Sequence, residues 1–460
     1  MRLVLSKDQS AEREGTSRVN GTRAAQRVRV TGDGKGVASH AGSLLIAELA
    51  DRVGLTTGLS AAMTHTRRRR SAHDPGVVLM QLAVMLADGG DCLADIAVLR
   101  QQPELFGRVG SDPTVWRVLD SIHCDGLRNI AAARAAARAR AWTAGAAPDE
   151  VVIDIDGTLL DAHSDKQDAT PTYKRGFGFY PILAYLDGTG EALAGLLRPG
   201  RAGSNNAADH LAVLDAALAQ LPVTPAEEEI VVRTDTAGAT HDFIDGCIDR
   251  GVGFLVGLPV DAAVRDAFML VQEEDWVPAI ESDGTRRDGA WLAELTDLIV
   301  HHWGDGVRVI ARRERPHPGA QLTLFDTAEG FRHQVFITDQ TEADLAALEL
   351  RHRHRAHVEN RIRAAKDTGL RNLPCEDFVR NEAWLQLVLI AQDLHAWAQA
   401  PCFDGDLAVA EPKKLRHRVW HAAADIVHTG RQTIVRFQRS WPWTTDIVIA
   451  FQRLRVALPS

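Results

Sequence analysis

A stripe of four polar residues has the residue types and spacing that a metal site on a helix would need. His352, Arg355, Glu359 and Lys366 are separated by three, four and seven positions, so on an α-helix their side chains lie on one face. From Arg351 to Lys366 the sequence has six Lys or Arg residues and a single acid, Glu359. A lone carboxylate in a cationic field suits a metal ligand that works beside a polyanion. A solvated helix face with i,i+4 ion pairs gives the same composition. The positions of further carboxylates are therefore needed to distinguish a metal site from a solvated surface.

The helix that carries this stripe is well specified by the sequence. No Gly or Pro occurs between Thr341 and Thr368. Thr341 followed by Asp344 predicts the N-terminal cap, and Gly369 predicts the stop. Four apolar residues predict the face that packs on a core: Leu345, Leu348, Val358 and Ile362.

Two further carboxylates stand at the ends of predicted strands. Asp156 ends the run VVIDID, and Asp235 ends the run from Ile230. Strands that alternate with helices predict an α/β fold with a partly parallel sheet. Two strand-end carboxylates and one from a packed helix could hold a pair of Mg²⁺ ions about 3.5–4 Å apart, which would activate a nucleophile and stabilise a leaving oxygen. Asp154 shares a face with Asp156 and stays an alternative first ligand.

The pattern elsewhere predicts several further elements. Residues 42–147 are Ala-rich and helical, with a capped helix start at Ser111-Asp112-Pro113-Thr114. Arginine clusters at 67–70 and 134–140 fit a solvated surface or a DNA-contacting domain equally well. We also expect a hairpin over 179–194, helices over 205–221, 240–249 and 378–398, and strands over 254–258, 307–312 and 335–338.

Bulk composition is that of a globular protein. The 460 residues are 45% hydrophobic and 25% charged, with a net charge of −9, which argues against a uniformly basic surface. From Lys413 to Ser460, however, nine Lys or Arg face two acids, and such a patch can bind DNA backbone. Five scattered cysteines fit free thiols in a reducing cytoplasm. No apolar run is long enough for a signal peptide or a membrane span, so we expect a soluble, cytoplasmic protein without a membrane partner.

The ordered set of motifs resembles the DDE transposases of bacterial insertion sequences, in the group marked by a Tyr-x2-Arg-x3-Glu-x6-Lys signature. Here the signature reads His352-x2-Arg355-x3-Glu359-x6-Lys366. The likeness extends to RHRHRAHVENRIRAAKDTGLRNLP, to the segment from DIDGTLLDAHSDKQ to RPGRAGSNNAADH, and to VVRTDTAGATHDF. It runs from about Val30 to the basic tail, and the subgroup looks like insertion-sequence family 1380.

The resemblance implies a fold and a metal site. The expected fold is α/β, with a ribonuclease-H-like catalytic core (a mixed sheet with flanking helices) that a β-rich insertion interrupts, plus an N-terminal helical domain. Asp156, Asp235 and Glu359 would be the catalytic metal ligands, holding two Mg²⁺ ions, or Mn²⁺ in their place. The expected boundaries are a flexible arm over 1–40, a helical DNA-binding domain over 41–148, the core over 149–261 and 333–400, the insertion over 262–332 and a basic C-terminal segment over 401–460.

The resemblance also implies DNA as the partner. The expected activity is cut-and-paste transposition, with strand cleavage at terminal inverted repeats and strand transfer to target DNA by a homodimer on double-stranded DNA at the nucleoid. Arg355 and Lys366 would contact the backbone of the transposon end. His352 replaces the family's Tyr, and a His can stack, bind a phosphate and gain charge near neutral pH. We further expect backbone contacts from the basic tail: Lys413, Lys414, Arg416, Arg418 and Arg431.

Two other functions are open to the sequence. VVIDIDGTLLDAHS also resembles the first motif of haloacid-dehalogenase-type phosphatases, in which Asp154 would be the nucleophile and Asp156 the acid. The acidic pair that this family needs after its Lys does not follow Lys366 in a suitable context, and this interpretation leaves Glu359 and the basic tail without a role. A DNA-binding protein without catalysis would lack a carboxylate, and none is missing here.

Overall fold

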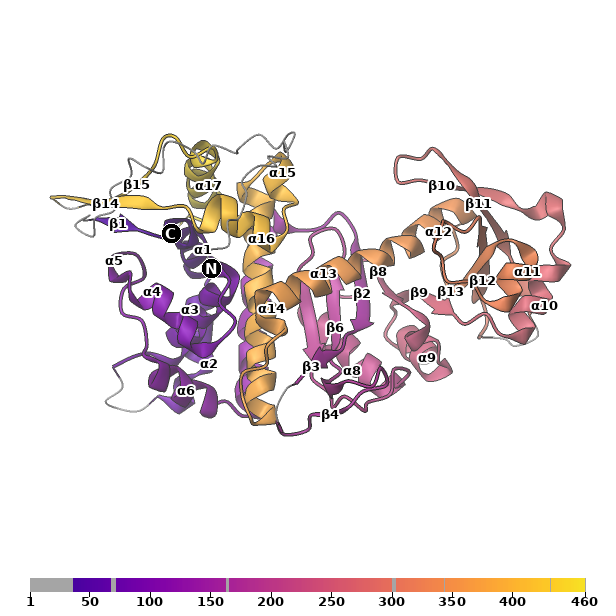
Figure 1. Ribbon diagram of the computed structural model, residues 1–460, viewed down its shortest axis with the longest axis horizontal. Coiled ribbons are helices and arrows are strands. Elements are labelled where there is room, and N and C mark those ends of the chain that lie inside the picture. The colour runs from indigo at the N-terminus through magenta and orange to yellow at the C-terminus, as the bar shows by residue number, and fades with distance from the viewer. Residues whose placement is uncertain are drawn as a thin grey trace, which may run out of the picture.

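The computed structural model describes residues 36–67, 72–162, 165–299, 303–342, 344–430 and 432–459. A large mixed sheet begins beside a group of N-terminal helices and extends into a lobe of strands and short helices at the other end of the molecule (Figure 1). Most of the expected N-terminal arm lies outside the described residues. Within those ranges, no helix combines the length and apolar character needed to cross a membrane.

The N-terminal region is helical, as the sequence predicts. Val115, Val118 and Leu119 of α6 are buried, and Ser111 precedes that helix. The first half of the chain contains these helices: α1 Leu44–Arg52, α2 Leu55–Ala62, α3 Pro75–Asp88, α4 Ala97–Arg100, α5 Pro103–Phe106, α6 Asp112–Asp120 and α7 Cys124–Ala141. Short 3₁₀ or π turns link them at Ala41–Ser43 (η2), Thr64–Thr66 (η3), Leu93–Ile96 (η4) and Trp142–Ala146 (η5).

The central sheet has nine strands in the order β10-β11-β12-β13-β9-β8-β2-β6-β7. The pairs β2–β8 and β8–β9 are parallel and the other neighbours are antiparallel, which confirms the expected partly parallel sheet. Its strands are β2 Val151–Gly157, β6 Ile182–Leu186, β7 Ala192–Leu196, β8 Ile230–Thr234, β9 Gly253–Leu258, β10 Val277–Ile280, β11 Arg286–Glu294, β12 Arg308–Glu314 and β13 Arg332–Thr338. The predicted hairpin is β6–β7, with its turn at Asp187-Gly188.

Two smaller sheets accompany the central one. β3 Leu160–Asp161, β4 Thr170–Pro171 and β5 Phe177–Phe179 form one of them in the order β3-β5-β4. β1 Val37–Ala38 joins the C-terminal hairpin β14 Ala424–Thr429 and β15 Gln432–Phe437 to form the other.

Alternating residues of the central strands face two different cores. Ile153 and Ile155 of β2 belong to a core formed with helices α8 and α9, whereas Leu183 and Tyr185 of β6 belong to a core formed with α13 and α14. Successive side chains of a strand point to opposite faces, so the acids of β2, which alternate with its isoleucines, face α13. The sheet therefore delivers these acids to the helix that carries Glu359.

The remaining helices follow the sequence closely. α8 is capped by Asn206 and α9 by Thr240, whose side-chain oxygens accept backbone N–H bonds. From residue 207 onward the described chain contains α8 Ala207–Leu218, α9 His241–Asp249, α10 Ala262–Leu270, α11 Leu324–Glu329, α12 Leu345–Arg353, α13 His357–Ala365, α14 Phe378–Cys402, α15 Gly405–Ala408, α16 Pro412–Leu415 and α17 Thr444–Ala457. Short turns occupy η6 Thr236–Gly238, η7 Glu273–Asp275, η8 Thr296–Leu298, η9 His354–Ala356, η10 Lys366–Leu370 and η11 Arg416–Trp420.

The long predicted helix is present, but it begins later than expected. Asp344 rather than Thr341 is the N-cap, because its Oδ1 accepts the N–H of Ala346 at 2.9 Å. The 3₁₀ turn η9 joins α12 to α13 within one continuous rod (Figure 1). Gly369 ends it with a φ of +93°, in the left-handed region that favours glycine. The predicted core face is buried at Leu348, Val358 and Ile362.

The region 262–332 contains more helix than its sequence indicated. Helices α10 and α11 lie within it besides strands β10 to β12. These three strands extend the central sheet through β13, so their hydrogen bonds are continuous with those of the core strands. The division of the chain into domains stays a prediction.

Two arginines in the arginine-rich segment of α7, Arg134 and Arg138, are neither on the solvated surface nor exposed for contact with DNA. Arg134 and Arg138 are buried, and both donate to Oδ2 of Asp393 on α14, at 2.6 and 2.7 Å. Arg138 also pairs with Glu191 at 2.9 Å. These arginines therefore join α7 to α14 and to the β6–β7 hairpin. Of the other cluster, Arg67 pairs with Asp74, and positions 68–70 lie outside the described residues.

Candidate active site

Asp156 and Asp235 are neighbours because their strands are parallel and adjacent. Ile155 of β2 pairs with Thr234 of β8, so the next residue of each strand reaches the same edge of the sheet. Asp156 is the penultimate residue of β2, and Asp235 follows β8 directly. The sequence prediction that both acids stand at strand ends is confirmed.

Glu359 faces this edge from α13, and Arg355 lies between the carboxylates. The Arg355 Nη2 atom is 3.4 Å from an oxygen of Asp156 and 3.6 Å from one of Asp235. Asp156 is 16% exposed and Asp235 is 41% exposed. Glu359 is exposed, and among the described residues it has no hydrogen bond or ion pair within the chain. The three carboxylates and the guanidinium thus form one cluster on the solvent side of the sheet edge.

The electrostatics of Asp156 show how strongly this cluster favours a cation. Burial is the largest influence and raises the pKa of Asp156 to about 6. Within that shift the charges of Asp235 and Glu359 also act to raise the pKa, whereas that of Arg355 lowers it. Like charges that crowd one site disfavour ionisation, and a cation relieves the repulsion. In this arrangement the Arg355 guanidinium supplies that positive charge.

The donor set fits divalent metal ions with a preference for oxygen. Three carboxylates without a sulfur or imidazole donor suit Mg²⁺ or Mn²⁺. The three groups do not all lie within 4.8 Å of one another, so they are spread more widely than the ligands of a single tight site. A pair of ions about 3.5–4 Å apart needs such a spread.

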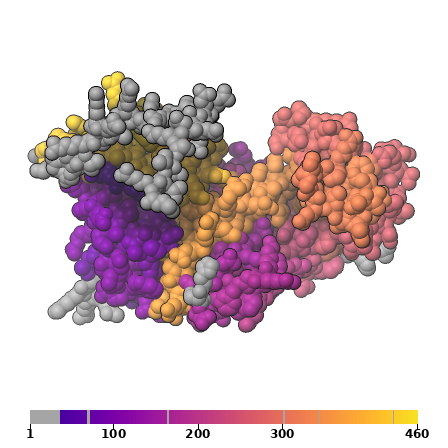
Figure 2. Space-filling view, viewed as in Figure 1, coloured from indigo at the N-terminus to yellow at the C-terminus, as the bar shows by residue number. Residues whose placement is uncertain are grey.

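A cavity of about 620 Å³ opens beside the cluster. Asp235, Arg355 and Glu359 line it together with Arg312 and residues of β9 and β13. In the space-filling view, the rod of α12 and α13 crosses the front of the molecule as a band open to solvent (Figure 2). Because Glu359 is exposed and Asp235 is 41% exposed, two of the three carboxylates are open to solvent.

His352 lines the same cavity, but its ring is held in an apolar stack. It lies parallel to the ring of Phe336, with centroids 4.4 Å apart and an angle of 9° between the planes. Its Nε2 is buried and has no partner among the described residues. Burial is the main reason that the pKa of His352 falls to about 3, and Arg355 contributes. Burial thus disfavours the positive charge that this His was expected to gain near neutral pH.

Asp154, the alternative first ligand, is held by an arginine inside the sheet. Its two oxygens accept hydrogen bonds from Nε and Nη2 of Arg233, both at 2.7 Å. Arg233 also donates to Asp187 and to the backbone oxygen of Arg351. A buried carboxylate held in this way is not free to act as a nucleophile, so the phosphatase interpretation is not favoured.

A second group of cations lies on the other side of Asp156. Lys366 donates from Nζ to the carbonyl of Leu159 at 3.1 Å. Burial and the charges of Arg371 and Lys174 lower the pKa of Lys366. Two adjoining cavities, of about 700 and 420 Å³, share Lys366.

The sequence analysis did not single out several residues of these two cavities. Lys166 and Arg371 line the larger one, whereas Lys174 and the aromatic pair Tyr173 and Tyr180 line the smaller. Tyr173 is exposed, and Tyr180 packs against Gly157, where a Cβ atom would come within 2.8 Å of its ring. The run Tyr173-Lys174-Arg175 in the sequence was the available signal, because aromatic and basic side chains together are typical of nucleic-acid contacts.

The basic tail divides into exposed and buried arginines and lysines. Lys413 and Lys414 are exposed on α16, and Lys413 pairs with Asp367 at 3.0 Å. Arg416 does not fit a DNA-binding role, because its buried guanidinium donates to backbone oxygens at the end of α3 and in η10. Arg418 is half-buried over the ring of Trp443. Position 431 lies outside the described residues.

Comparison with known proteins assigns the family. The model of the family "Transposase DDE domain group 1" matches residues 20–458. A search of curated proteins found no match. Among solved structures, a cryo-EM structure of piggyBac transposase in a synaptic complex with hairpin DNA is similar, with a TM-score of 0.42 and 8% identity over 82% of this chain and 79% of that chain. Because the family model spans nearly the whole sequence, the chain belongs to the DDE transposases and is a metal-dependent enzyme of DNA transposition.

Proposed function

We propose that this protein catalyses cut-and-paste transposition of an insertion sequence of the 1380 type. This proposal rests on one observation: Asp156 and Asp235 meet at one sheet edge, opposite Glu359, with the cationic Arg355 between the two aspartates. The substrate would be the terminal inverted repeats of the element, followed by strand transfer to target DNA. Two ends must be processed together, so we propose a homodimer on double-stranded DNA, associated with the nucleoid.

The strand order supports a ribonuclease-H-like core as the scaffold. Strands β7-β6-β2 are antiparallel, and β8 and β9 follow in parallel beside β2. We propose that strands β2, β6, β7, β8 and β9 with their flanking helices form this core, and that the segment from α10 to β12 is the insertion. Its three tryptophans mostly serve packing: Trp276 is buried against Phe268, and Trp303 stacks on His241.

Each residue of the site has a distinct proposed task. Asp156, Asp235 and Glu359 would hold two Mg²⁺ ions, and these ions would supply an activated water or 3′-hydroxyl and stabilise the leaving oxygen. Arg355 would turn from the carboxylates toward a backbone phosphate of the transposon end. Lys366 would fix the strand on the other side of Asp156.

We propose three further contacts to that strand. Lys166, Lys174 and Tyr173 border the cavities that share Lys366. Positive side chains would follow the phosphates there, and an exposed aromatic ring would stack on a base. His352 would act through the shape of its ring, because burial lowers its pKa and disfavours the charged form.

The proposal is tested with the element's own DNA. Short inverted repeats should bracket the gene, and a duplex with one repeat should be cut at its end by the purified protein with Mg²⁺. Labelling each strand separately distinguishes a hairpinned end from a simple double-strand break. EDTA should stop the reaction, and Mn²⁺ should restore it. Absence of cleavage at bracketing repeats, with the protein folded and bound to them, would contradict the proposed activity.

Replacing Arg355 should strengthen metal binding while weakening catalysis. Its guanidinium lies within 4 Å of two carboxylates, where a unit charge interacts by about 4 kcal/mol at an effective dielectric constant of 20. The guanidinium repels a metal ion bound at these carboxylates. If Arg355→Gln removes a repulsion equal to a third of that energy, Mn²⁺ affinity would tighten by about tenfold. Isothermal titration measures this affinity, and the cleavage assay reports the missing interaction with the phosphate. Arg363→Gln on the same helix, whose partner is Glu411, should leave Mn²⁺ affinity unchanged, and an equal affinity in Arg355→Gln would refute competition between guanidinium and metal.

The exposed lysines of α16 should govern part of the salt dependence of DNA binding. Each lysine that binds a phosphate releases counterions, so the slope of log K against log salt falls by about one unit for each such lysine removed. Lys413→Gln with Lys414→Gln should therefore lower the slope by about two units in fluorescence anisotropy. Arg250→Gln removes one positive charge at the end of α9 and should leave the slope as it was. A slope unaltered by the two lysine changes would identify them as solvated surface.

A further inference from the structure

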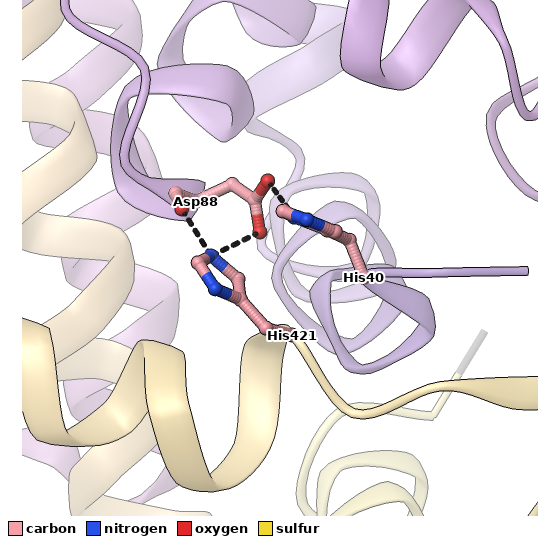
Figure 3. A group of neighbouring side chains, drawn as sticks. All are labelled: His40, Asp88 and His421. Carbon is pink, nitrogen blue, oxygen red and sulfur yellow. Dashed lines mark hydrogen bonds and ion pairs between the residues drawn. The ribbon is translucent and has the colours of Figure 1, made fainter. Parts of the chain in front are cut away.

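Three side chains from distant parts of the chain converge at the end of α3 (Figure 3). Asp88 is the last residue of that helix, His40 follows β1, and His421 follows η11. Nδ1 of His40 lies 2.6 Å from Oδ2 of Asp88, and Nε2 of His421 lies 3.5 Å from Oδ1. The ligand atoms of all three lie within 4.8 Å of one another. This group is separate from the carboxylates of the active site and has a different chemistry.

The surroundings of Asp88 concentrate negative charge. Its carboxylate is buried and stands at the C-terminus of a helix, where the backbone carbonyls already carry a partial negative charge. A buried charge must be paired or bound to a metal to be tolerated. Ser43 donates its hydroxyl to the carboxylate, and Nε2 of His421 also lies 2.7 Å from the backbone oxygen of Asp88. Arg416 reaches the same helix end, at the carbonyl of Ala87. Hydrogen-bonding side chains from several segments thus meet at this helix end.

We propose that His40, Asp88 and His421 bind a divalent transition-metal ion, with Zn²⁺ the best match. Two imidazole nitrogens and one carboxylate oxygen with a free fourth position are a ligand set that zinc sites use. Mg²⁺ prefers oxygen ligands and would not select this set.

The spacing of the three groups fits a tetrahedral ion. Metal–ligand bonds of about 2.0–2.2 Å place neighbouring ligand atoms roughly 3.3–3.5 Å apart in a tetrahedron. The observed 3.5 Å between His421 and Asp88 meets this value. The shorter contact of His40 would lengthen by about 0.8 Å as the ion takes the place of the hydrogen bond. His40 is half-buried and His421 is exposed, so solvent gives the ion access and a water can complete its shell.

A metal here would hold the two ends of the described chain together. Val37 and Ala38 of β1 pair with β14, and the N–H of Ala41 donates to the carbonyl of Ala422 at 2.9 Å. These contacts are backbone hydrogen bonds of a two-residue strand, which alone give little stability. The ion would fasten this strand and the C-terminal hairpin to α3 at the same point. With a water as its fourth ligand the site would remain open, and its link between these segments would be independent of the proposed transposition reaction.

The experiment measures metal binding directly on the full-length protein, purified without a polyhistidine tag. After treatment with a chelating resin, the protein should take up one equivalent of Zn²⁺, determined by elemental analysis and by competition with a chromophoric chelator. Co²⁺ should give the visible absorption of a four-coordinate site. His421→Gln should weaken Zn²⁺ affinity by more than about 100-fold, because loss of an outer partner of a metal ligand already costs about 10–100-fold. Asp88→Asn should act in the same direction.

Two controls make the result specific. His428→Gln removes an exposed histidine of β14 whose partner is Glu104, and it should keep full zinc affinity. Glu359→Gln should also keep it, since that change affects only the active site. Zinc uptake that is lost in Glu359→Gln and kept in His421→Gln would overturn the proposal, as would a protein with no stoichiometric zinc. If Asp88→Asn does not fold, the Co²⁺ spectrum of His421→Gln decides: an unchanged spectrum refutes the site.

Discussion

Glu359→Gln is expected to abolish Mg²⁺-dependent cleavage of the transposon ends while leaving DNA binding intact. The amide keeps the size of the side chain but not the negative charge that a metal ligand supplies. We expect the cleavage rate to fall by at least about 1,000-fold, which corresponds to about 4 kcal/mol of transition-state stabilisation. Single-turnover cleavage of a labelled end duplex measures the rate, and a gel-shift assay with Ca²⁺ measures binding.

The surroundings of Glu359 indicate that this substitution should affect the active site without disturbing the fold. Glu359 is exposed and forms no hydrogen bond or ion pair within the described part of the chain, so folding should not depend on it. Glu150→Gln is the matched control, because Glu150 is an exposed acid that pairs with Arg351 of α12 at 2.9 Å but lies outside the carboxylate cluster. The control should cleave as the unaltered protein does. Cleavage at the normal rate by Glu359→Gln would remove this residue from the metal site.

The central part of the candidate site could be predicted because local sequence determines it. Buried apolar runs that end in an acid specify a strand and the position of the acid at its end, and parallel pairing then brings Asp156 and Asp235 to one edge. Helical periodicity likewise places Arg355 and Glu359 on one face. The choice between Asp154 and Asp156 could not be made from the strand alone. It depends on Arg233, which is the register partner of Asp154 on the neighbouring strand.

The burial of two arginines could not be predicted from the charge pattern of the sequence. Arg134 and Arg416 stand in basic runs that composition assigns to surface or DNA, yet both are buried. Their partners lie far away in sequence, at Asp393 for the first and at the end of α3 for the second. Charge density along the chain says nothing about such tertiary partners. The stack of His352 on Phe336 could not be predicted either, because the second ring comes from a different element, β13.

The largest stability effect is expected at Asp393, the centre of the buried charge network. Asp393 accepts hydrogen bonds from Arg134, Arg138 and the backbone N–H of Ala192, at 2.6, 2.7 and 2.9 Å. Glu191 is the second acid, so two acids balance the two arginines. Burial raises the pKa of Asp393, while both guanidinium groups lower it. The paired arrangement therefore keeps four charges in the interior without an uncompensated one.

Asp393→Ala would leave a buried guanidinium without its carboxylate. Removing one partner of a buried ion pair costs about 3–5 kcal/mol, so the urea midpoint should fall markedly, with α7, α14 and the β6–β7 hairpin deprived of their common partner. Asp215→Ala provides the surface comparison, because Asp215 accepts two hydrogen bonds from the guanidinium of Arg250, and its loss should cost no more than about 1 kcal/mol. Equal losses for the two variants would mean that the interior network is hydrated. A large difference would establish that α7 is anchored through its arginines, and that these side chains are unavailable to DNA.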